Sequence, residues 1–126
     1  NEQTRATIAP SLVELWRGIE STGSNVVAIA DTPFWGVRPE QCLARDPNCT
    51  IPYKSLKGHD RIVEAHNLYP DVPLIDFHDV ICPADQCPAV VGNVFVWRDT
   101  DHLTALYSRT MADVFGNRLD VAILDN

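Results

Sequence analysis

The chain has 126 residues, of which 45% are hydrophobic and 21% are charged, and this composition suits one folded domain and argues against an intrinsically disordered chain. The formal net charge is −7 and the ten basic residues are scattered, which argues against nucleic acid or an anionic membrane surface as a partner, because phosphate binding needs a clustered basic face. No run of roughly 18 apolar residues occurs, so the sequence predicts no membrane-spanning helix.

The first half of the chain predicts one amphipathic helix and one buried strand. Apolar residues at helical spacing predict a helix over residues 10–20, with Pro10 in its first turn. Residues 26–30, VVAIA, form a wholly apolar run between turn signals, which is typical of a strand buried on both faces of a parallel sheet. This strand leads into DTPFW, a proline-containing loop with two aromatic side chains, and then into the first pair of cysteines.

The second half predicts a helix, a strand and a hairpin. The stretch GHDRIVEAHNLYP indicates a second helix that Asp60 caps and Pro70 ends. The stretch VPLIDFHDVIC, residues 72–82, predicts a second strand that becomes polar toward its end. Residues 89–97, AVVGNVFVW, predict a β-hairpin, because Gly92-Asn93 suits a two-residue turn between two β-prone runs.

The last helix gives the clearest pattern. Apolar residues hold one helical face from Leu103 to Phe115, and Gly116 is the expected C-terminal stop. Residues 119–126 are expected to form either a last edge strand or a docked tail. The alternation of helices and strands along the chain predicts an α/β layer fold.

Four cysteines, Cys42, Cys49, Cys82 and Cys87, fall in two local pairs. Four cysteines permit three disulfide connectivities, and the two short loops are the natural choice. Each local bridge would remove roughly 2 kcal/mol of unfolded-chain entropy. The alternatives are free thiols and a four-cysteine zinc site, for which CPADQC has a suitable spacing and CLARDPNC does not. Disulfides would indicate an oxidising compartment.

The stretch WRDTDHLT contains a candidate acid–base pair. Asp99 and His102 are three residues apart, so in a turn that enters a helix they can lie on one side. A carboxylate there can hold one imidazole nitrogen and leave the other free to take a proton from a hydroxyl nucleophile. The alternative is structural: Asp99 or Asp101 caps the last helix, and His102 is a surface histidine in its first turn.

Three further residues are candidate substrate contacts. Asp31 follows the buried strand, at the carboxyl edge where open α/β sheets bind ligands, or it simply starts the turn before Pro33. Phe34 and Trp35 could stack on a sugar or line an acyl pocket, or they could cover the core. These readings stay open at the level of the sequence.

No metal ion and no cofactor is expected. His66 and the polar residues around His78 are of ligand type, but no histidine pair at i, i+4 and no His-Glu-x-x-His pattern accompanies them. A polar strand end that meets solvent accounts for these residues.

The order of these features resembles a known family. NVVAIADTPFW, then PEQC before a second cysteine, then LIDFHDVICPADQCPAVVGNVFVWRDTDHLT resemble the C-terminal part of the SGNH domain of acyltransferase type 3 membrane proteins. These are bacterial enzymes that O-acylate cell-envelope carbohydrate. The resemblance implies a three-layer, flavodoxin-like SGNH hydrolase fold with a parallel sheet. It also implies that Asp99 is the triad acid, that His102 is the base, and that the cysteines form two local disulfides.

One departure from the family is plain, because the chain has no Gly-Asp-Ser motif to supply a nucleophilic serine. We therefore expect residues 1–126 to be one domain portion, the C-terminal part of an extracytoplasmic SGNH-like domain. The resemblance implies that the serine and the oxyanion hole come from an upstream part of the same protein. That part would carry the membrane acyltransferase domain that tethers this one on the periplasmic or outer face of the cell membrane.

The function implied is transfer of an acyl group, expected to be acetyl, to a hydroxyl of cell-envelope carbohydrate. The implied partners are an acyl donor, the glycan and the upstream domain, and an unpaired sheet edge predicts a homodimer of the isolated portion. The alternatives are a non-catalytic envelope module that binds carbohydrate or a partner through DTPFW, and a secreted carbohydrate esterase.

Overall fold

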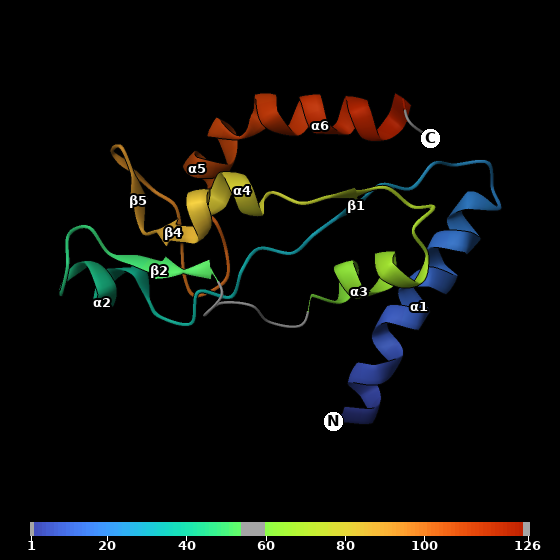
Figure 1. Ribbon diagram of the computed structural model, residues 1–126, viewed down its shortest axis with the longest axis horizontal. Coiled ribbons are helices and arrows are strands. Elements are labelled where there is room, and N and C mark those ends of the chain that lie inside the picture. Colours follow the sequence, from blue (N-terminus) through green and yellow to red (C-terminus); the bar gives the residue numbers. More distant parts are fainter. Residues whose placement is uncertain (1, 54–59, 125–126) are drawn as a thin grey trace. The chain divides into compact units, whose positions relative to one another are not determined.

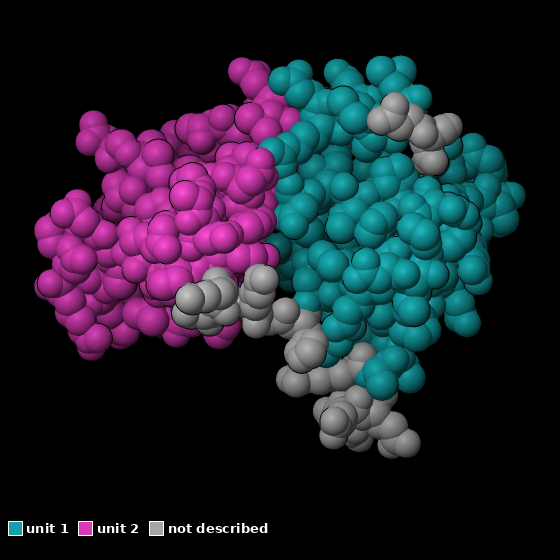
Figure 2. Space-filling view, viewed as in Figure 1, with its two compact units in different colours: residues 1–31, 59–76, 116–126 teal, residues 32–58, 77–115 magenta. Residues whose placement is uncertain are grey.

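A computed structural model describes residues 2–53 and 60–124, with side chains from residue 6 onward. The chain divides into two compact units, which Figure 2 colours separately. Unit 1 comprises residues 1–31, 59–76 and 116–126, and unit 2 comprises residues 32–58 and 77–115. Each unit is therefore built from segments that are distant in the sequence.

The first helix of unit 1, α1 (Glu2–Glu20), is longer than the sequence predicts. Pro10 lies inside this helix and not in its first turn, so the predicted start was wrong. A proline inside a helix removes one backbone hydrogen bond and disfavours the helical turn before it. Here Ala9 is buried at 5% exposure in the unit 1 core, and this packing favours a helix that continues on both sides of the proline.

Helix α3 (Arg61–Leu68) packs against α1, as Figure 1 shows. The predicted cap is confirmed, since Asp60 Oδ1 accepts hydrogen bonds from the backbone N–H groups of Ile62 at 2.8 Å and Val63 at 3.2 Å. The core that these helices enclose consists of small and aromatic side chains: Ala9, Val13, Trp16, Ala28, Ala65 and Val72.

Two short strands run in parallel in unit 1, β1 (Ala28–Ile29) and β3 (Leu74–Ile75). They are the only parallel pair in the described part of the chain, so an α/β arrangement is present but the expected three-layer sheet is not confirmed. The strand predicted over residues 72–82 was too long. It ends at Ile75, before the polar residue Asp76, and residues 78–81 form a helix instead.

The C-terminal helix also differs from the prediction. A break at Met111 divides it into α5 (Ala105–Thr110) and α6 (Ala112–Leu124). Gly116 lies inside α6 and does not stop it, and residues 119–124 continue the helix where a strand or tail was expected. Residues 117–122 of α6 line an open pocket of about 510 Å³ together with residues 73–76. This contact with the unit 1 strand favours continuation of the helix through the glycine.

Unit 2 combines short helices with two antiparallel strand pairs. Strand β2 (Thr50–Pro52) pairs with β4 (Gln86–Pro88), and the predicted hairpin is confirmed as β5 (Val90–Val91) with β6 (Val94–Phe95). Gly92 takes a φ of 59° in the hairpin turn, a conformation that glycine adopts without a steric penalty. The short helices are α2 (Pro39–Leu43), α4 (His78–Ile81) and the 3₁₀ turn η2 (Pro83–Asp85).

Both disulfides lie in unit 2. Cys42 pairs with Cys49 and Cys82 pairs with Cys87, which confirms the two local bridges and leaves no cysteine for a zinc site. Cys82 and Cys87 are fully buried, as is Val96 of the same unit. The second bridge therefore forms part of the packed centre of unit 2.

Candidate active site

The stretch WRDTDHLT forms a loop that closes on itself between β6 and α5. Trp97 and Leu103 form an antiparallel bridge, and the backbone N–H of Arg98 donates to the carbonyl of His102 at 2.8 Å. Backbone hydrogen bonds therefore close the base, or neck, of the loop, and the two aspartates and the histidine belong to this closed loop.

Thr104 caps the helix that follows. Its side-chain oxygen accepts a hydrogen bond from the backbone N–H of Tyr107 at 3.1 Å. Neither Asp99 nor Asp101 caps α5, and His102 precedes the helix by three residues. The helix-cap alternative for the aspartates was therefore wrong, as was a place for His102 in the first helical turn.

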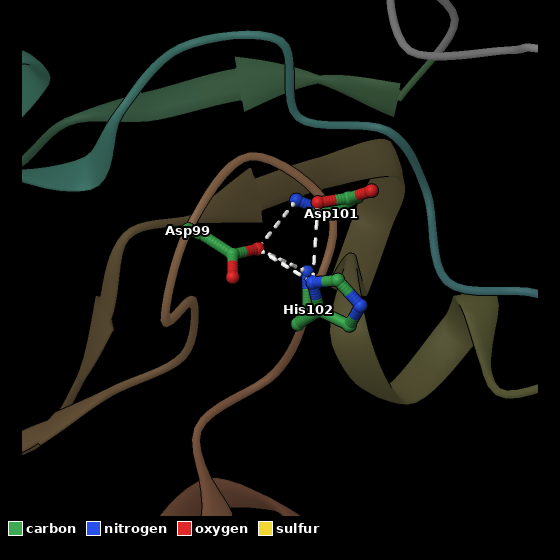
Figure 3. Close-up of side chains that lie close together, drawn as sticks. All are labelled: Asp99, Asp101 and His102. Atoms are coloured by element: carbon green, nitrogen blue, oxygen red, sulfur yellow. Dashed lines mark hydrogen bonds and ion pairs between the residues drawn. The ribbon is translucent and has the colours of Figure 1, made fainter.

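Asp99 and His102 are in direct contact, as Figure 3 shows. Nδ1 of His102 lies 2.8 Å from Oδ1 of Asp99. An ionised carboxylate only accepts hydrogen bonds, so Nδ1 carries the proton in this pair. The other nitrogen of the neutral ring, Nε2, is then a proton acceptor, and it points away from Asp99.

The carboxylate of Asp99 accepts hydrogen bonds on both oxygens. Oδ1 also receives the backbone N–H groups of His102 at 2.9 Å and Asp101 at 3.2 Å. Nε of Arg98 donates a hydrogen bond to Oδ2 at 3.1 Å, and Nη2 forms an ion pair with the same oxygen at 3.1 Å, so the guanidinium fork of Arg98 meets one carboxylate oxygen. The orientation of Asp99 is therefore fixed by its own neighbours in the loop.

These contacts set the charge state of Asp99. Partial burial raises the pKa of the carboxyl, but the hydrogen bonds from the backbone of Asp101, from His102 and from the preceding arginine outweigh it. The net result is a pKa well below the usual range of an aspartate. Asp99 is therefore ionised at any pH at which an imidazole can act as a base.

Asp101 supplies a second carboxylate near the ring, with Oδ1 3.2 Å from Nδ1 of His102. Asp99, Asp101 and His102 form the one group of at least three acidic, histidine or cysteine side chains in the described ranges that lie close enough to share a cation. Their donor and acceptor atoms already bond to one another, and we assign no ion to them. The expectation of no metal and no cofactor stays a prediction.

The pair is accessible. The side chain of His102 is 60% exposed and that of Asp99 is 38% exposed. The imidazole ring of His102 is therefore largely open to solvent.

The three candidate substrate contacts differ in accessibility. Asp31 follows β1 in unit 1, where its backbone N–H donates to Oδ2 of Asp60 at 2.8 Å. Phe34 is 58% exposed, whereas Trp35 is 1% exposed and stacks on Trp97 with ring centroids 5.8 Å apart. Phe34 thus offers an exposed ring and Trp35 does not, while the substrate roles of all three residues stay predictions.

The described histidines outside the loop have other partners. Nδ1 of His66 lies 2.9 Å from the carbonyl oxygen of Val72. The ring of His78 stacks on Tyr53, and its Nε2 lies 2.9 Å from Asp85 Oδ1. Of the three described histidine rings, only that of His102 pairs with a carboxylate that accepts hydrogen bonds on both of its oxygens.

Comparison with known proteins identifies the family of the chain. A family model described as the SGNH domain, fused to AT3 domains, matches residues 1–117. The chain belongs to this family. It is an acyltransferase-associated SGNH module, and the match includes the loop with the acid–base pair and all four cysteines. No curated protein and no solved structure gives a significant match.

The AT3 association comes from the description of the family, and the disulfides bear on location. No helix in the described part of the chain is long and apolar enough to cross a bilayer. The two disulfides fit a place outside the cytoplasm, because thiols there are oxidised.

Sequence reasoning missed two residues of the site. Arg98 forms the fork on Asp99, and its place directly before the aspartate was the available signal. Thr104 caps α5, and a threonine two residues after the histidine, at the start of the helical pattern, could have identified it.

Proposed function

We propose that this chain supplies the acid and the base of a Ser-His-Asp site in a membrane O-acyltransferase that acts outside the cytoplasm. The serine comes from outside this chain, in the upstream part of the protein. The reaction moves an acyl group, expected to be acetyl, from a donor to a hydroxyl of cell-envelope carbohydrate. The observation that carries the proposal is the 2.8 Å contact between His102 Nδ1 and Asp99, in a histidine side chain that is 60% exposed.

The first half of the reaction forms an acyl-enzyme. Nε2 of His102 takes the proton of the serine hydroxyl as its oxygen attacks the acyl carbonyl. Asp99 holds the ring by Nδ1–H and stabilises the imidazolium that results. The tetrahedral intermediate then collapses, and the protonated ring returns its proton to the leaving group of the donor. Upstream amides and an asparagine, as the family resemblance implies, would stabilise the oxyanion.

The second half transfers the acyl group. A carbohydrate hydroxyl gives its proton to Nε2 and attacks the acyl-serine, and collapse of this second intermediate returns the proton to the serine. Phe34, which is 58% exposed, is an aromatic ring that this chain offers for stacking on a sugar. Asp31 remains a candidate for a sugar hydroxyl at the end of β1.

The experiment substitutes the pair in the intact acyltransferase and measures ester-linked acyl groups on envelope carbohydrate by mass spectrometry. His102→Ala and Asp99→Asn should each lower transfer on the order of 10³-fold or more, because one removes the base and the other favours the wrong tautomer of the ring. Circular dichroism of the variant chains should match the wild type, since the His102 side chain is 60% exposed and asparagine keeps the shape of Asp99.

Asp46→Asn is the matched control. Asp46 Oδ1 also accepts a backbone N–H two residues on, from Asn48 at 2.8 Å, but has no histidine partner in residues 2–53 or 60–124. It should retain wild-type transfer. Unchanged acylation in His102→Ala would overturn the proposal in favour of a non-catalytic module. Acyl release to water with no transfer to glycan would favour an esterase.

A further inference from the structure

Two successive peptide groups of the loop are held by Asp99 on their N–H side. The peptide that joins Thr100 to Asp101 donates its N–H to Oδ1 of Asp99 at 3.2 Å, and the next peptide, which joins Asp101 to His102, does so at 2.9 Å. The orientation of these two peptide groups thus affects the position of Asp99 relative to His102. Their carbonyl oxygens point to other partners, which lie far away in the sequence.

Thr32 binds the second of these carbonyls. Its hydroxyl donates to the carbonyl oxygen of Asp101 at 2.6 Å across 69 residues of sequence. The peptide directly before His102 is therefore held on both sides, by the threonine hydroxyl at its oxygen and by Asp99 at its N–H.

The backbone of Trp35 and Gly36 binds the first carbonyl. Their N–H groups donate to the oxygen of Thr100 at 2.6 and 3.3 Å. Gly36 takes a φ of 72°, which other residues adopt only with strain. Both peptides of the loop are consequently held from the same five-residue segment, residues 32–36.

The segment is itself anchored. The indole of Trp35 is 1% exposed and stacks on Trp97, which is 2% exposed and lies at the neck of the loop. Trp97 Nε1 donates to the carbonyl of Pro88 at 3.0 Å, so the stack rests on β4. A buried aromatic pair of this kind contributes about 0.5–1.5 kcal/mol beyond the area that it buries.

The geometry points to residues 32–36 as the support that positions the imidazole of His102, with Thr32 as its positioning residue. This inference rests on the proposed function, since it concerns the same acid–base pair. Residues 32–36 are then mainly a support for the catalytic loop, and Phe34 within them is 58% exposed.

Loss of the hydroxyl should affect the chemical step and spare substrate binding. A backbone peptide that rotates shifts both the ring and the carboxylate, and small errors in the placement of a base reduce the rate steeply. The loss of one neutral hydrogen bond corresponds to a fall of about 3- to 10-fold in kcat.

The kinetic test uses the intact acyltransferase with Thr32→Val, which keeps the β-branched shape and removes the hydroxyl. We expect kcat to fall about 3- to 10-fold with KM within about twofold. Thr32→Ser should restore most of the rate. Thr22→Val is the matched control, because the Thr22 hydroxyl also donates to a backbone carbonyl, that of Ile19 at 2.7 Å, and it should behave as wild type.

A second readout does not depend on acyl transfer. Nitrogen-15 NMR of the histidine-labelled 126-residue chain reports which ring nitrogen carries the proton, with His102 assigned from a His102→Gln sample. Wild type should show the Nδ1–H form, and Thr32→Val should show a mixture of both tautomers. If Thr32→Val loses the native circular dichroism spectrum, Thr32→Ala replaces it.

The outcomes separate the two proposals. Wild-type kcat together with an unchanged tautomer in Thr32→Val would overturn the positioning role. If His102→Ala retains acyl transfer, the proposed function fails, and the nitrogen-15 result alone then decides whether Thr32 orders the ring.

Discussion

At the residue scale, the site depends on one carboxylate oxygen. Oδ1 of Asp99 accepts the ring N–H of His102 and two backbone N–H groups, and Oδ2 faces the fork of Arg98. The same contacts that orient the acid also keep it charged. The orientation and the ionisation of Asp99 thus depend on the same hydrogen bonds. A variant that disturbs the orientation of the carboxylate should also disturb its ionisation.

This coupling predicts a pH dependence of stability. Because the folded-state pKa of Asp99 is depressed, the carboxylate stabilises the fold fully above its unfolded pKa of about 4. That contribution is lost as the pH falls from there toward the folded-state pKa. The free energy of unfolding in urea, measured from pH 2 to pH 6, should therefore fall more steeply in acid for wild type than for Asp99→Asn. Parallel curves would contradict the depressed pKa.

At the element scale, local patterns located some elements and misjudged the length of others. The Asp60 cap, the Gly92 turn and the local cysteine pairs were predictable, because each depends on residues within a few positions of one another. The Asp-x-x-His pair was found for the same reason. Its support was not, since the contact between Thr32 and Asp101 spans 69 residues and leaves no periodicity in the sequence.

The wrong element boundaries also have a physical cause. Gly116 was expected to end the last helix, and the strand after residue 72 was expected to run to residue 82. Propensity decides such ends only where tertiary contacts are weak. Arg118 of α6 donates a hydrogen bond to the carbonyl of Asp76, which ties the continued helix to the end of the shortened strand.

The glycine inside α6 predicts a stabilising substitution. Gly116 has no left-handed φ, and a Cβ built on it meets no atom within 4 Å. Gly116→Ala should therefore raise the free energy of unfolding by about 0.5–1 kcal/mol, because alanine loses less backbone entropy in a helix. Gly36→Ala is the contrasting variant and should destabilise the protein, since φ at that position is 72°. Urea denaturation of both variants measures the effect, and a destabilised Gly116→Ala would refute it.

At the scale of the whole molecule, the chain holds its covalent cross-links in one unit and its parallel strands in the other. Both disulfides join residues of unit 2, and β1 and β3 form the two-stranded sheet of unit 1. Each strand of that sheet has one partner among the described residues. The expected homodimer of the chain rests on these open edges and stays a prediction.

The division into units predicts an uneven response to reduction. Each disulfide closes a short loop and should contribute roughly 2 kcal/mol. Under a reducing agent, the amides of Arg98 and Thr104 in unit 2 should exchange hydrogen faster, while those of α3 in unit 1 keep their protection. Hydrogen-exchange mass spectrometry follows both regions at once. Equal loss of protection in α3 would show that the units do not respond separately.

The closed neck of the WRDTDHLT loop has a consequence for the proposed acyltransferase. Arg98, Asp99 and His102 lie within five consecutive residues, 98–102, and residues 32–36 hold the same loop at the carbonyls of Thr100 and Asp101. On the proposed function, a movement that brings the base toward the serine therefore carries residues 32–36 and 98–102 together, or it breaks the hydrogen bonds to those two carbonyls.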